Sequence, residues 1–228
     1  AQIKDILGRA WATLQPVAVP AVATLAAVLV PLGLLYQLGF MILPTGLAGL
    51  LGLLINLAQL AAMIILFPSV ARFLLGSHIG KPIPIQTAVN QSIQKAADVA
   101  VHCAVASIPL GVFVPSIYYV EDKKIGASIG RNFNLLAKEL VPILVSIFAF
   151  GFAFAIGSGI VVYIFTLLPA GAILASVVSN TLTAFAMAYM SALGVSQYFA
   201  VRRKHEGGDP EGEARARLGA AEAALPAA

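Results

Sequence analysis

Residues 140–201 read LVPILVSIFAFGFAFAIGSGIVVYIFTLLPAGAILASVVSNTLTAFAMAYMSALGVSQYFAV, a run of 62 residues without Asp, Glu, Lys or Arg. A helix needs about 20 apolar residues to cross a bilayer, because each residue rises about 1.5 Å and the hydrocarbon core is about 30 Å thick. The run is therefore long enough for two crossings. Its turn is expected at Leu168-Pro169-Ala170-Gly171, because Pro lacks a backbone donor and Gly tolerates a positive φ.

A second uncharged run of the same length covers residues 10–71 and contains a similar turn signal, Leu43-Pro44-Thr45-Gly46. Together the two runs predict an all-α, polytopic membrane protein, because a single segment in lipid satisfies its backbone groups only as a helix. Barrel strands would alternate apolar and polar residues, and these runs do not. The expected membrane-spanning helices cover residues 17–42, 46–70, 142–167 and 171–199.

The composition of the whole chain agrees with this interpretation. Of its 228 residues 60% are hydrophobic and 11% are charged, and its mean hydropathy is +0.92. A soluble domain carries about 25% charged residues. The composition therefore excludes a water-soluble enzyme, a disordered regulator and a disulfide-stapled secreted domain.

The middle of the chain, residues 81–124, is ambiguous. Its uncharged run, residues 99–120, is interrupted by Pro109 and Pro115, and the polar segment before it suits a helix at the membrane surface. We expect four full spans plus a broken or re-entrant middle segment, and the alternative is five spans with a kinked third. The four-span topology puts every basic cluster in the cytoplasm and both short turns outside, as the positive-inside rule predicts.

The two halves of the chain resemble each other. Gly8-Arg9-Ala10-Trp11 matches Gly130-Arg131-Asn132-Phe133, and the two proline-glycine turns also correspond. We therefore expect two units, each an interfacial helix followed by a transmembrane hairpin. The predicted divisions are residues 1–80 for the first unit, 81–124 for the middle segment, 125–201 for the second unit and 202–228 for a cytoplasmic tail. Asp209-Pro210 could begin a short helix in this tail, which we expect to be mobile.

Both predicted interfacial helices have an apolar stripe opposite charged residues. Basic side chains and Trp are favoured at the headgroup boundary, where they meet anionic lipid. The residues expected to contact lipid headgroups are Lys4, Arg9, Trp11, Lys123, Lys124, Arg131 and Lys138.

The stretch from Tyr118 to Leu136, YYVEDKKIGASIGRNFNLL, resembles a motif of uncharacterised prokaryotic inner-membrane proteins. That group includes the membrane domain attached to some glycerophosphodiester phosphodiesterases. Ala127, Arg131, Phe133 and Leu135 sit near the places that the motif expects, and the chain has Asn132 and Phe133 where Ser and Trp are common. The resemblance implies a helical-hairpin architecture in the inner membrane of a prokaryote. It does not carry over the phosphodiesterase activity, because these 228 residues contain no such domain.

Few residues suggest chemistry. Asn56 with Gln59, and Asn180 with Thr183, are spaced i, i+3 within predicted spans, so each pair shares one helix face. They suit interhelical hydrogen bonds or the polar lining of a path for a small solute or ion. His102 suits a packed, hydrogen-bonded position or a proton relay. No catalytic, cofactor-binding or metal-ligating set is predicted, and we expect no cofactor.

The function expected from these features is that of a non-catalytic accessory, scaffolding or assembly subunit of a membrane complex. The alternative is a channel or carrier with Asn56 and Asn180 lining the path. The expected partners are the lipid bilayer with its anionic headgroups and another membrane protein or a second copy of the chain. Binding to nucleic acid is not expected.

Overall fold

The computed structural model describes residues 2–106 and 111–223, and the described part is helical throughout, without strands. A 3₁₀ turn, η1 (Gln15–Val17), joins the first two helices. In chain order the α-helices are α1 (Gln2–Leu14), α2 (Ala18–Ile42), α3 (Thr45–His78), α4 (Ile85–Gln94), α5 (Ala96–Ala106), α6 (Val114–Glu121), α7 (Ile125–Lys138), α8 (Leu140–Thr166), α9 (Gly171–His205) and α10 (Pro210–Ala223).

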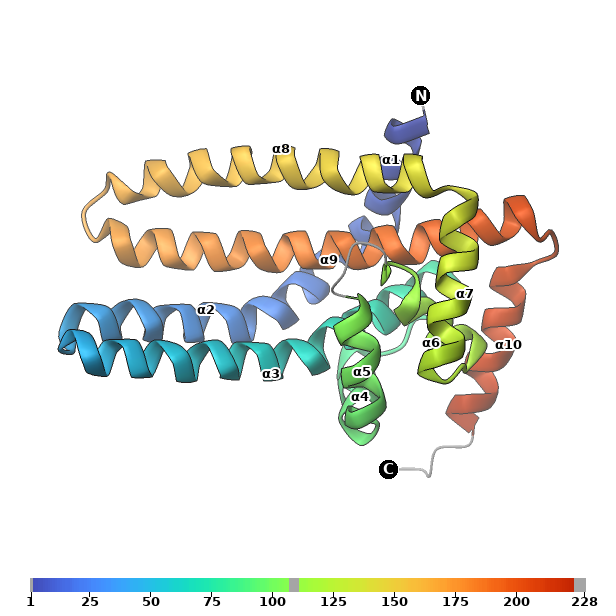
Figure 1. Cartoon of the computed structure of the whole chain (residues 1–228), viewed down its shortest axis with the longest axis horizontal. Helices are drawn as coiled ribbons and strands as arrows, with labels where there is room; N and C mark the ends of the chain where they lie inside the picture. Colours follow the sequence, from blue (N-terminus) through green and yellow to red (C-terminus); the bar gives the residue numbers. More distant parts are fainter. Residues whose placement is uncertain (1, 107–110, 224–228) are drawn as a thin grey trace.

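Four helical segments in the described part of the chain are long and apolar enough to cross a membrane, and they contain α2, α3, α8 and α9. The prediction of four spans in an all-α, multi-pass membrane protein is confirmed. The α2–α3 and α8–α9 turns lie at the same end of the molecule (Figure 1). The two hairpins therefore run in the same direction, as an even number of crossings requires, and the described residues contain no fifth candidate span.

The two turns share a sequence pattern but not a backbone conformation. In the first, Pro44 directly precedes α3 with φ −55° and ψ 148°. In the second, Ala170 precedes α9 in the left-handed conformation, with φ 59°. A Cβ on Gly171 would lie 2.5 Å from the Thr166 carbonyl oxygen, so this glycine is required by the close approach of the two helix ends.

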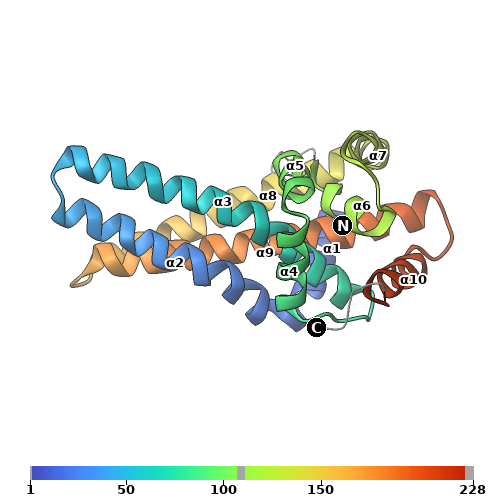
Figure 2. The same cartoon turned by 90° about the horizontal axis from the view of Figure 1, so that it is seen from below.

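Helices α3 and α9, with 34 and 35 residues, are longer than a crossing needs. Their C-terminal parts are surrounded by the short helices at the end opposite the turns. Figure 2 shows α5, α7 and α10 nearly end-on, while the four long helices run across the picture. The core of this end contains fully buried side chains from several elements, among them Leu74, Phe113, Ile117 and Tyr198.

The middle segment consists of α4, α5 and α6, with 10, 11 and 8 residues, and none is long enough to span a membrane. These helices pack against α3, and α6 also contacts α9. The backbones approach closely at Gly194, where an added Cβ would lie 2.5 Å from the Val112 carbonyl oxygen. Pro115 lies in the first turn of α6, whereas the predicted bend at Pro109 lies outside the described residues.

Where a mobile tail was expected, residues 210–223 form a docked helix, and the helix expected to begin near Asp209-Pro210 is present as α10. Asp209 caps it by accepting a hydrogen bond from the Gly212 amide at 2.9 Å. Ala214 and Leu218 are buried against the rest of the protein, and Arg215 Nε donates to the Ile79 carbonyl at 2.5 Å. A helix with one small apolar face is thus held in place by docking and hydrogen bonding.

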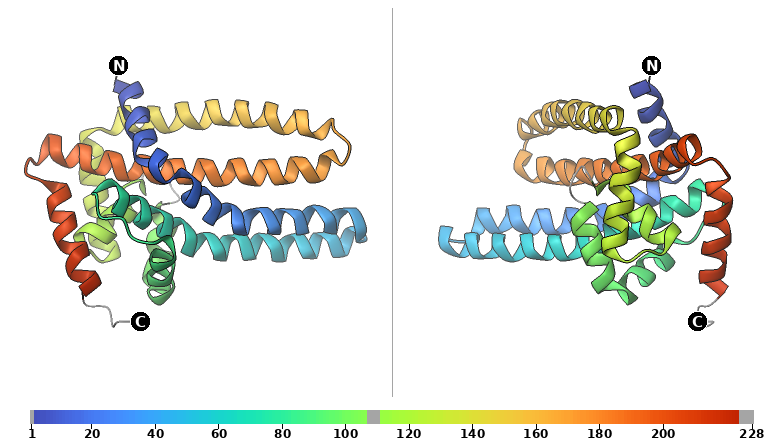
Figure 3. Two further views of the ribbon diagram at one scale, coloured as in Figure 1. Left: turned by 180° about the vertical axis from the view of Figure 1, so that it is seen from behind. Right: turned by 45° about the vertical axis from the view of Figure 1, so that its right-hand side comes forward.

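The two halves recur in element order but not in packing partners. Helices α1 and α7 bury four residues each, and the four positions in α7 lie 122 residues after those in α1. However, α2 packs on α9 as well as on α3, whereas its counterpart α8 packs on α9 and α1. Helix α1 lies across the membrane helices (Figure 3) and packs mainly on α9.

Candidate functional site

The second predicted polar pair lies on α9. The Asn180 amide donates to the Ser176 carbonyl of its own helix at 2.8 Å, and its side chain lies against Gly33 of α2. A Cβ on Gly33 would lie 2.1 Å from Asn180 Nδ2, so α2 and α9 approach closely there because position 33 has no side chain. Thr183 is exposed and donates to the Ser179 carbonyl at 2.9 Å.

The first predicted pair lies on α3 in a different environment. Asn56 is exposed and Gln59 is half-buried. Asn180, in contrast, faces the α2–α9 contact. The four side chains are therefore not gathered around one polar path in the described structure.

His102 is buried between α5 and α7. Its Nδ1 donates to the Asp98 carbonyl at 2.7 Å, and its Nε2 lies 3.4 Å from Ser128 Oγ. Its ring packs on Tyr118 with 4.2 Å between centroids. These contacts fit the packed, hydrogen-bonded interpretation of this histidine. Within residues 2–106 and 111–223, no three His, Cys, Asp or Glu side chains come close enough together to hold a metal ion.

The predicted lipid contacts fall into two groups. On α1, Lys4 and Trp11 are exposed, and Arg9 Nη2 donates to Gln197 Oε1 at 3.2 Å. Around α7 the structure gives most of the basic side chains a protein partner. Lys124 is exposed at the N-terminus of α7, and the others make ion pairs with acidic side chains: Lys123 with Glu121, Arg131 with Glu121 and Glu206, and Lys138 with Glu206.

The ion pairs of α7 belong to a cluster centred on Glu206, which follows the last residue of α9. Both Glu206 oxygens accept bonds of 2.6 Å from Arg131, and Oε2 also accepts one of 3.1 Å from Arg202. Arg131 reaches Glu121 of α6 as well, at 3.0 Å, and Tyr198 donates to the same carboxylate at 2.9 Å. The cluster thus joins α6, α7 and the end of α9.

Two carboxylates in this region have perturbed acidities. The bidentate bond from Arg131 lowers the pKa of Glu206 from 4.5 to about 2, against the opposing effect of burial. Bonds from Lys204 and His205 lower the pKa of Glu139, which precedes α8. Both groups are therefore held as carboxylates at neutral pH and serve as fixed negative charges.

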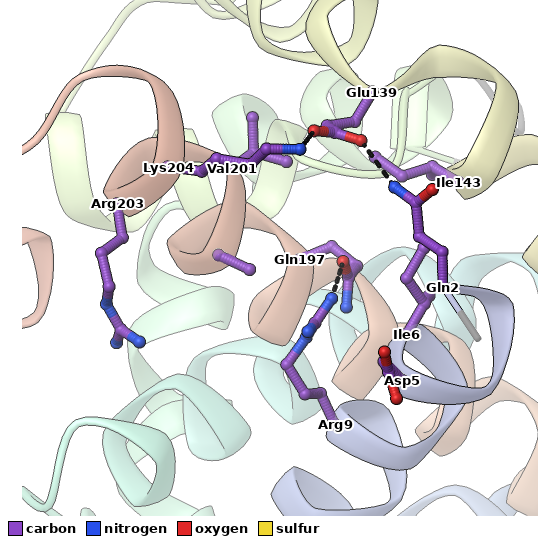
Figure 4. A pocket seen from close by; sticks show the side chains of 11 residues that line it. Gln2, Asp5, Ile6, Arg9, Glu139, Ile143, Gln197, Val201, Arg203 and Lys204 are labelled. Atoms are coloured by element: carbon purple, nitrogen blue, oxygen red, sulfur yellow. Dashed lines mark hydrogen bonds and ion pairs between the residues drawn. The ribbon is translucent and has the colours of Figure 1, made fainter.

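A pocket of about 410 Å³ opens beside Glu139 (Figure 4). It is lined by α1, the start of α8 and the C-terminal part of α9: Gln2, Asp5, Ile6, Arg9, Glu139, Ile143, Gln197, Ala200, Val201, Arg203 and Lys204. Glu139 accepts from Gln2 at 3.0 Å and forms an ion pair with Lys204 at the rim. Gln197 is only 2% exposed, and its Nε2 has no hydrogen-bond partner among the described residues.

Sequence reasoning identified Arg9 and Arg131 but missed Glu121 and Glu206, the acidic partners of Arg131. Glu206 follows a basic run, Arg202-Arg203-Lys204, which predicts a membrane-facing cluster rather than an ion-paired one. Gln197 lies close to the end of an apolar run. From the sequence, this position indicates a polar group at the membrane boundary. No family model, curated protein or solved structure matches this chain.

Proposed function

We propose that this protein is a non-catalytic subunit of a membrane complex, which binds another membrane protein through the exposed face of α8. The observation that carries the proposal is the exposure of Gly151, Ala155 and Gly159 on this helix. A Cβ added at either glycine would meet nothing within 4 Å. Small residues at this spacing let two helix backbones approach closely in lipid.

Three other glycines of the membrane helices have partners within the chain, whereas Gly46 and Gly49 near the start of α3 also meet nothing within 4 Å. Gly33 lies against Asn180, Gly39 against Leu51, and Gly52 against Tyr36. Close packing at small residues is thus the way in which this chain joins its own helices. The small residues Gly151 and Gly159 of α8 have no such neighbour in the described structure. This supports an interface between α8 and a helix from another chain.

The test is native purification in a mild detergent, followed by mass spectrometry of the co-purifying proteins. Gly151→Leu combined with Gly159→Leu fills the proposed face. Gly157→Leu is the matched control, because Gly157 is also exposed with nothing within 4 Å but lies on another side of α8. We expect the partner to remain with wild type and Gly157→Leu and to be lost from the double variant.

A wild-type protein that stays a lone monomer, in detergent and after cross-linking in the membrane, would refute the subunit proposal. A double variant that keeps its partner would refute the assignment to α8. If the only bound protein is a second copy of the chain, the complex is a homo-oligomer and not a hetero-complex.

The alternative, a channel or carrier, receives less support from the geometry. A continuous polar path would need the side chains of Asn56 and Asn180 to face a common space, whereas Asn56 is exposed and Asn180 packs against Gly33. The test of the carrier is solute flux into proteoliposomes. Flux by the wild type that is lost in the double variant Asn56→Leu with Asn180→Leu would favour the carrier, provided that the variant still assembles.

We also propose that the end of the molecule carrying α10 faces the cytoplasm of a prokaryotic cell. The basic residues flanking the four spans gather at this end, and the uncharged turns lie at the other. That asymmetry is the one that orients membrane proteins with basic loops inside. A reporter fused after α10 that reads out as extracytoplasmic would contradict this orientation.

A further inference from the structure

The pocket between α1, α8 and α9 lies where α1 crosses the membrane helices, at one end of the apolar spans (Figures 3 and 4). Its volume of about 410 Å³ is within the range typical of small-molecule sites, roughly 300–1,000 Å³. Amphipathic helices in such a position lie at the level of the lipid headgroups. The molecule most available to this pocket is therefore a membrane lipid.

Gln197 gives the pocket a specific chemical requirement. Its side-chain oxygen accepts a hydrogen bond from Arg9 Nη2 at 3.2 Å, and a guanidinium can only donate. The amide oxygen is therefore the atom that meets Arg9, and Nε2 is left for another partner. That nitrogen is buried and unpartnered within the described structure. Leaving a buried donor of this kind unpaired costs free energy. We therefore expect a ligand that offers a hydrogen-bond acceptor to Nε2.

A phosphodiester supplies both the acceptor and the charge. One of its two free oxygens can accept from the Gln197 amide. The other can accept from the guanidinium of Arg9, which forms strong charge-assisted bonds to phosphate. Gln197 and Arg9 thus converge on one anion from α9 and α1.

The pocket wall contains two carboxylates, and Asp5 is the one that we expect to bind the cationic part of the ligand. Glu139 is already paired with Lys204. Asp5 is exposed and lies four residues before Arg9, about 6 Å along the helix. An ethanolamine ammonium group lies a comparable distance from its phosphate, because two carbons separate it from the ester oxygen. The pair Arg9 and Asp5 therefore suits a zwitterionic headgroup better than an anionic one.

A route for the acyl chains adjoins the pocket. A second hollow of about 300 Å³ shares Gln2 with it and is lined by Ile3, Val141, Pro142 and Val145. Beyond it, Phe148 and Phe152 continue an exposed apolar stripe along α8. A lipid with its headgroup at Arg9 can place a chain along this stripe, in the direction of the membrane core.

We infer that this pocket binds one glycerophospholipid of the phosphatidylethanolamine class, with the phosphodiester at Arg9 and Gln197 and the ammonium at Asp5. This site goes beyond the proposed subunit function and does not depend on it, because its headgroup contacts, Arg9, Gln197 and Asp5, come from α1 and α9. A lipid held there would fill the space between α1, α8 and α9.

The experiment uses native mass spectrometry of the full chain in mild detergent, with equal amounts of phosphatidylethanolamine and phosphatidylglycerol. Wild type is expected to retain one phosphatidylethanolamine. Gln197→Glu is expected to reduce retention at least about tenfold, because the new carboxylate repels phosphate. The same change gives Arg9 an ionic partner, so the fold is preserved, as circular dichroism would check.

Lys124→Gln is the matched control, because Lys124 is an exposed basic residue outside the pocket, and it should retain the lipid at the wild-type level. If Gln197→Glu does not fold, Gln197→Met removes the donor without adding charge and is expected to lose the lipid too. Retention by folded Gln197 variants equal to that of Lys124→Gln would overturn the site.

Two further measurements test the identity of the ligand. Asp5→Asn is expected to reduce the preference for phosphatidylethanolamine over phosphatidylglycerol several-fold. A wild-type preference for phosphatidylglycerol would overturn the role of Asp5. Displacement of the lipid by millimolar inorganic phosphate would identify a site for a soluble anion and overturn the lipid assignment.

Discussion

Glu206→Gln is the substitution that tests the ion-pair cluster at the end of α9. The carboxylate accepts two bonds of 2.6 Å from Arg131, one of 3.1 Å from Arg202 and one of 3.4 Å from Lys138. Gln keeps the size and shape of the side chain but removes the charge. The substitution therefore weakens the link between α7 and α9 without creating a cavity.

The magnitude follows from the acidity of Glu206. Its pKa falls from 4.5 to about 2 on folding, and each pH unit of such a difference corresponds to about 1.4 kcal/mol. The charged cluster therefore stabilises the fold by up to about 3 kcal/mol at neutral pH, with the partial exposure of the side chain, 22%, reducing this value. Because the pKa is lowered, the contribution is complete above pH 4.5 and is lost as the pH falls toward 2.

The assay is the free energy of unfolding in detergent micelles, measured at several pH values from 7 down to 3. We expect Glu206→Gln to be less stable than wild type at pH 7 and the difference to shrink below pH 4.5. Glu213→Gln is the control, because Glu213 bonds the same Arg202 at 2.8 Å but is 56% exposed. This control should change stability by less than about 1 kcal/mol.

Two results would refute this reasoning. One is a loss for Glu206→Gln no greater than for Glu213→Gln at pH 7. The other is a difference between wild type and Glu206→Gln that stays constant down to pH 3. The first result would show that the short bonds to Arg131 contribute no more than an exposed pair, and the second that the contribution of Glu206 does not come from its charge.

Three further predictions concern packing and use the same unfolding assay. Gly194→Ala should destabilise the protein by about 1–3 kcal/mol, because the added Cβ would lie 2.5 Å from a backbone carbonyl in the segment leading into α6; Gly157→Ala, which meets nothing within 4 Å, should not. Leu218→Ala should cost about 2–3 kcal/mol and increase hydrogen exchange in α6, since this buried side chain helps to hold α10 in place; unchanged exchange in α6 would contradict the docking of α10. Asn180→Leu should destabilise the α2–α9 contact, whereas Asn56→Leu on the exposed face of α3 should be neutral within about 0.5 kcal/mol; equal effects would show that the two positions are equivalent.

Much of the fold can be predicted from the sequence. The two uncharged runs predicted the starts of α2, α3, α8 and α9 within two residues, because burial in lipid depends on the local hydropathy of each segment, whereas α3 and α9 extend 8 and 6 residues beyond their predicted ends. The proline-glycine signals located both turns. Asp209-Pro210 located the start of α10, because helix capping is also a local property.

The candidate site was only partly predictable. Arg131 was expected to meet lipid headgroups because it lies on an amphipathic helix, but it pairs with Glu206, which is 75 residues away. Arg9 likewise meets Gln197 at a separation of 188 residues. Local patterns report the polarity of a helix face and not the partner that covers it.

The sequence by itself determined that the chain is an all-α membrane protein with two hairpins and basic residues gathered at their ends. These features follow from the transfer of short segments between water and lipid, so each segment carries its own signal. Only the tertiary structure decided that α10 is docked, that Asn180 faces Gly33 while Asn56 is exposed, and that Gln197 has a buried amide beside Arg9. Those facts depend on the approach of distant helices, which is set by the packing of many side chains together.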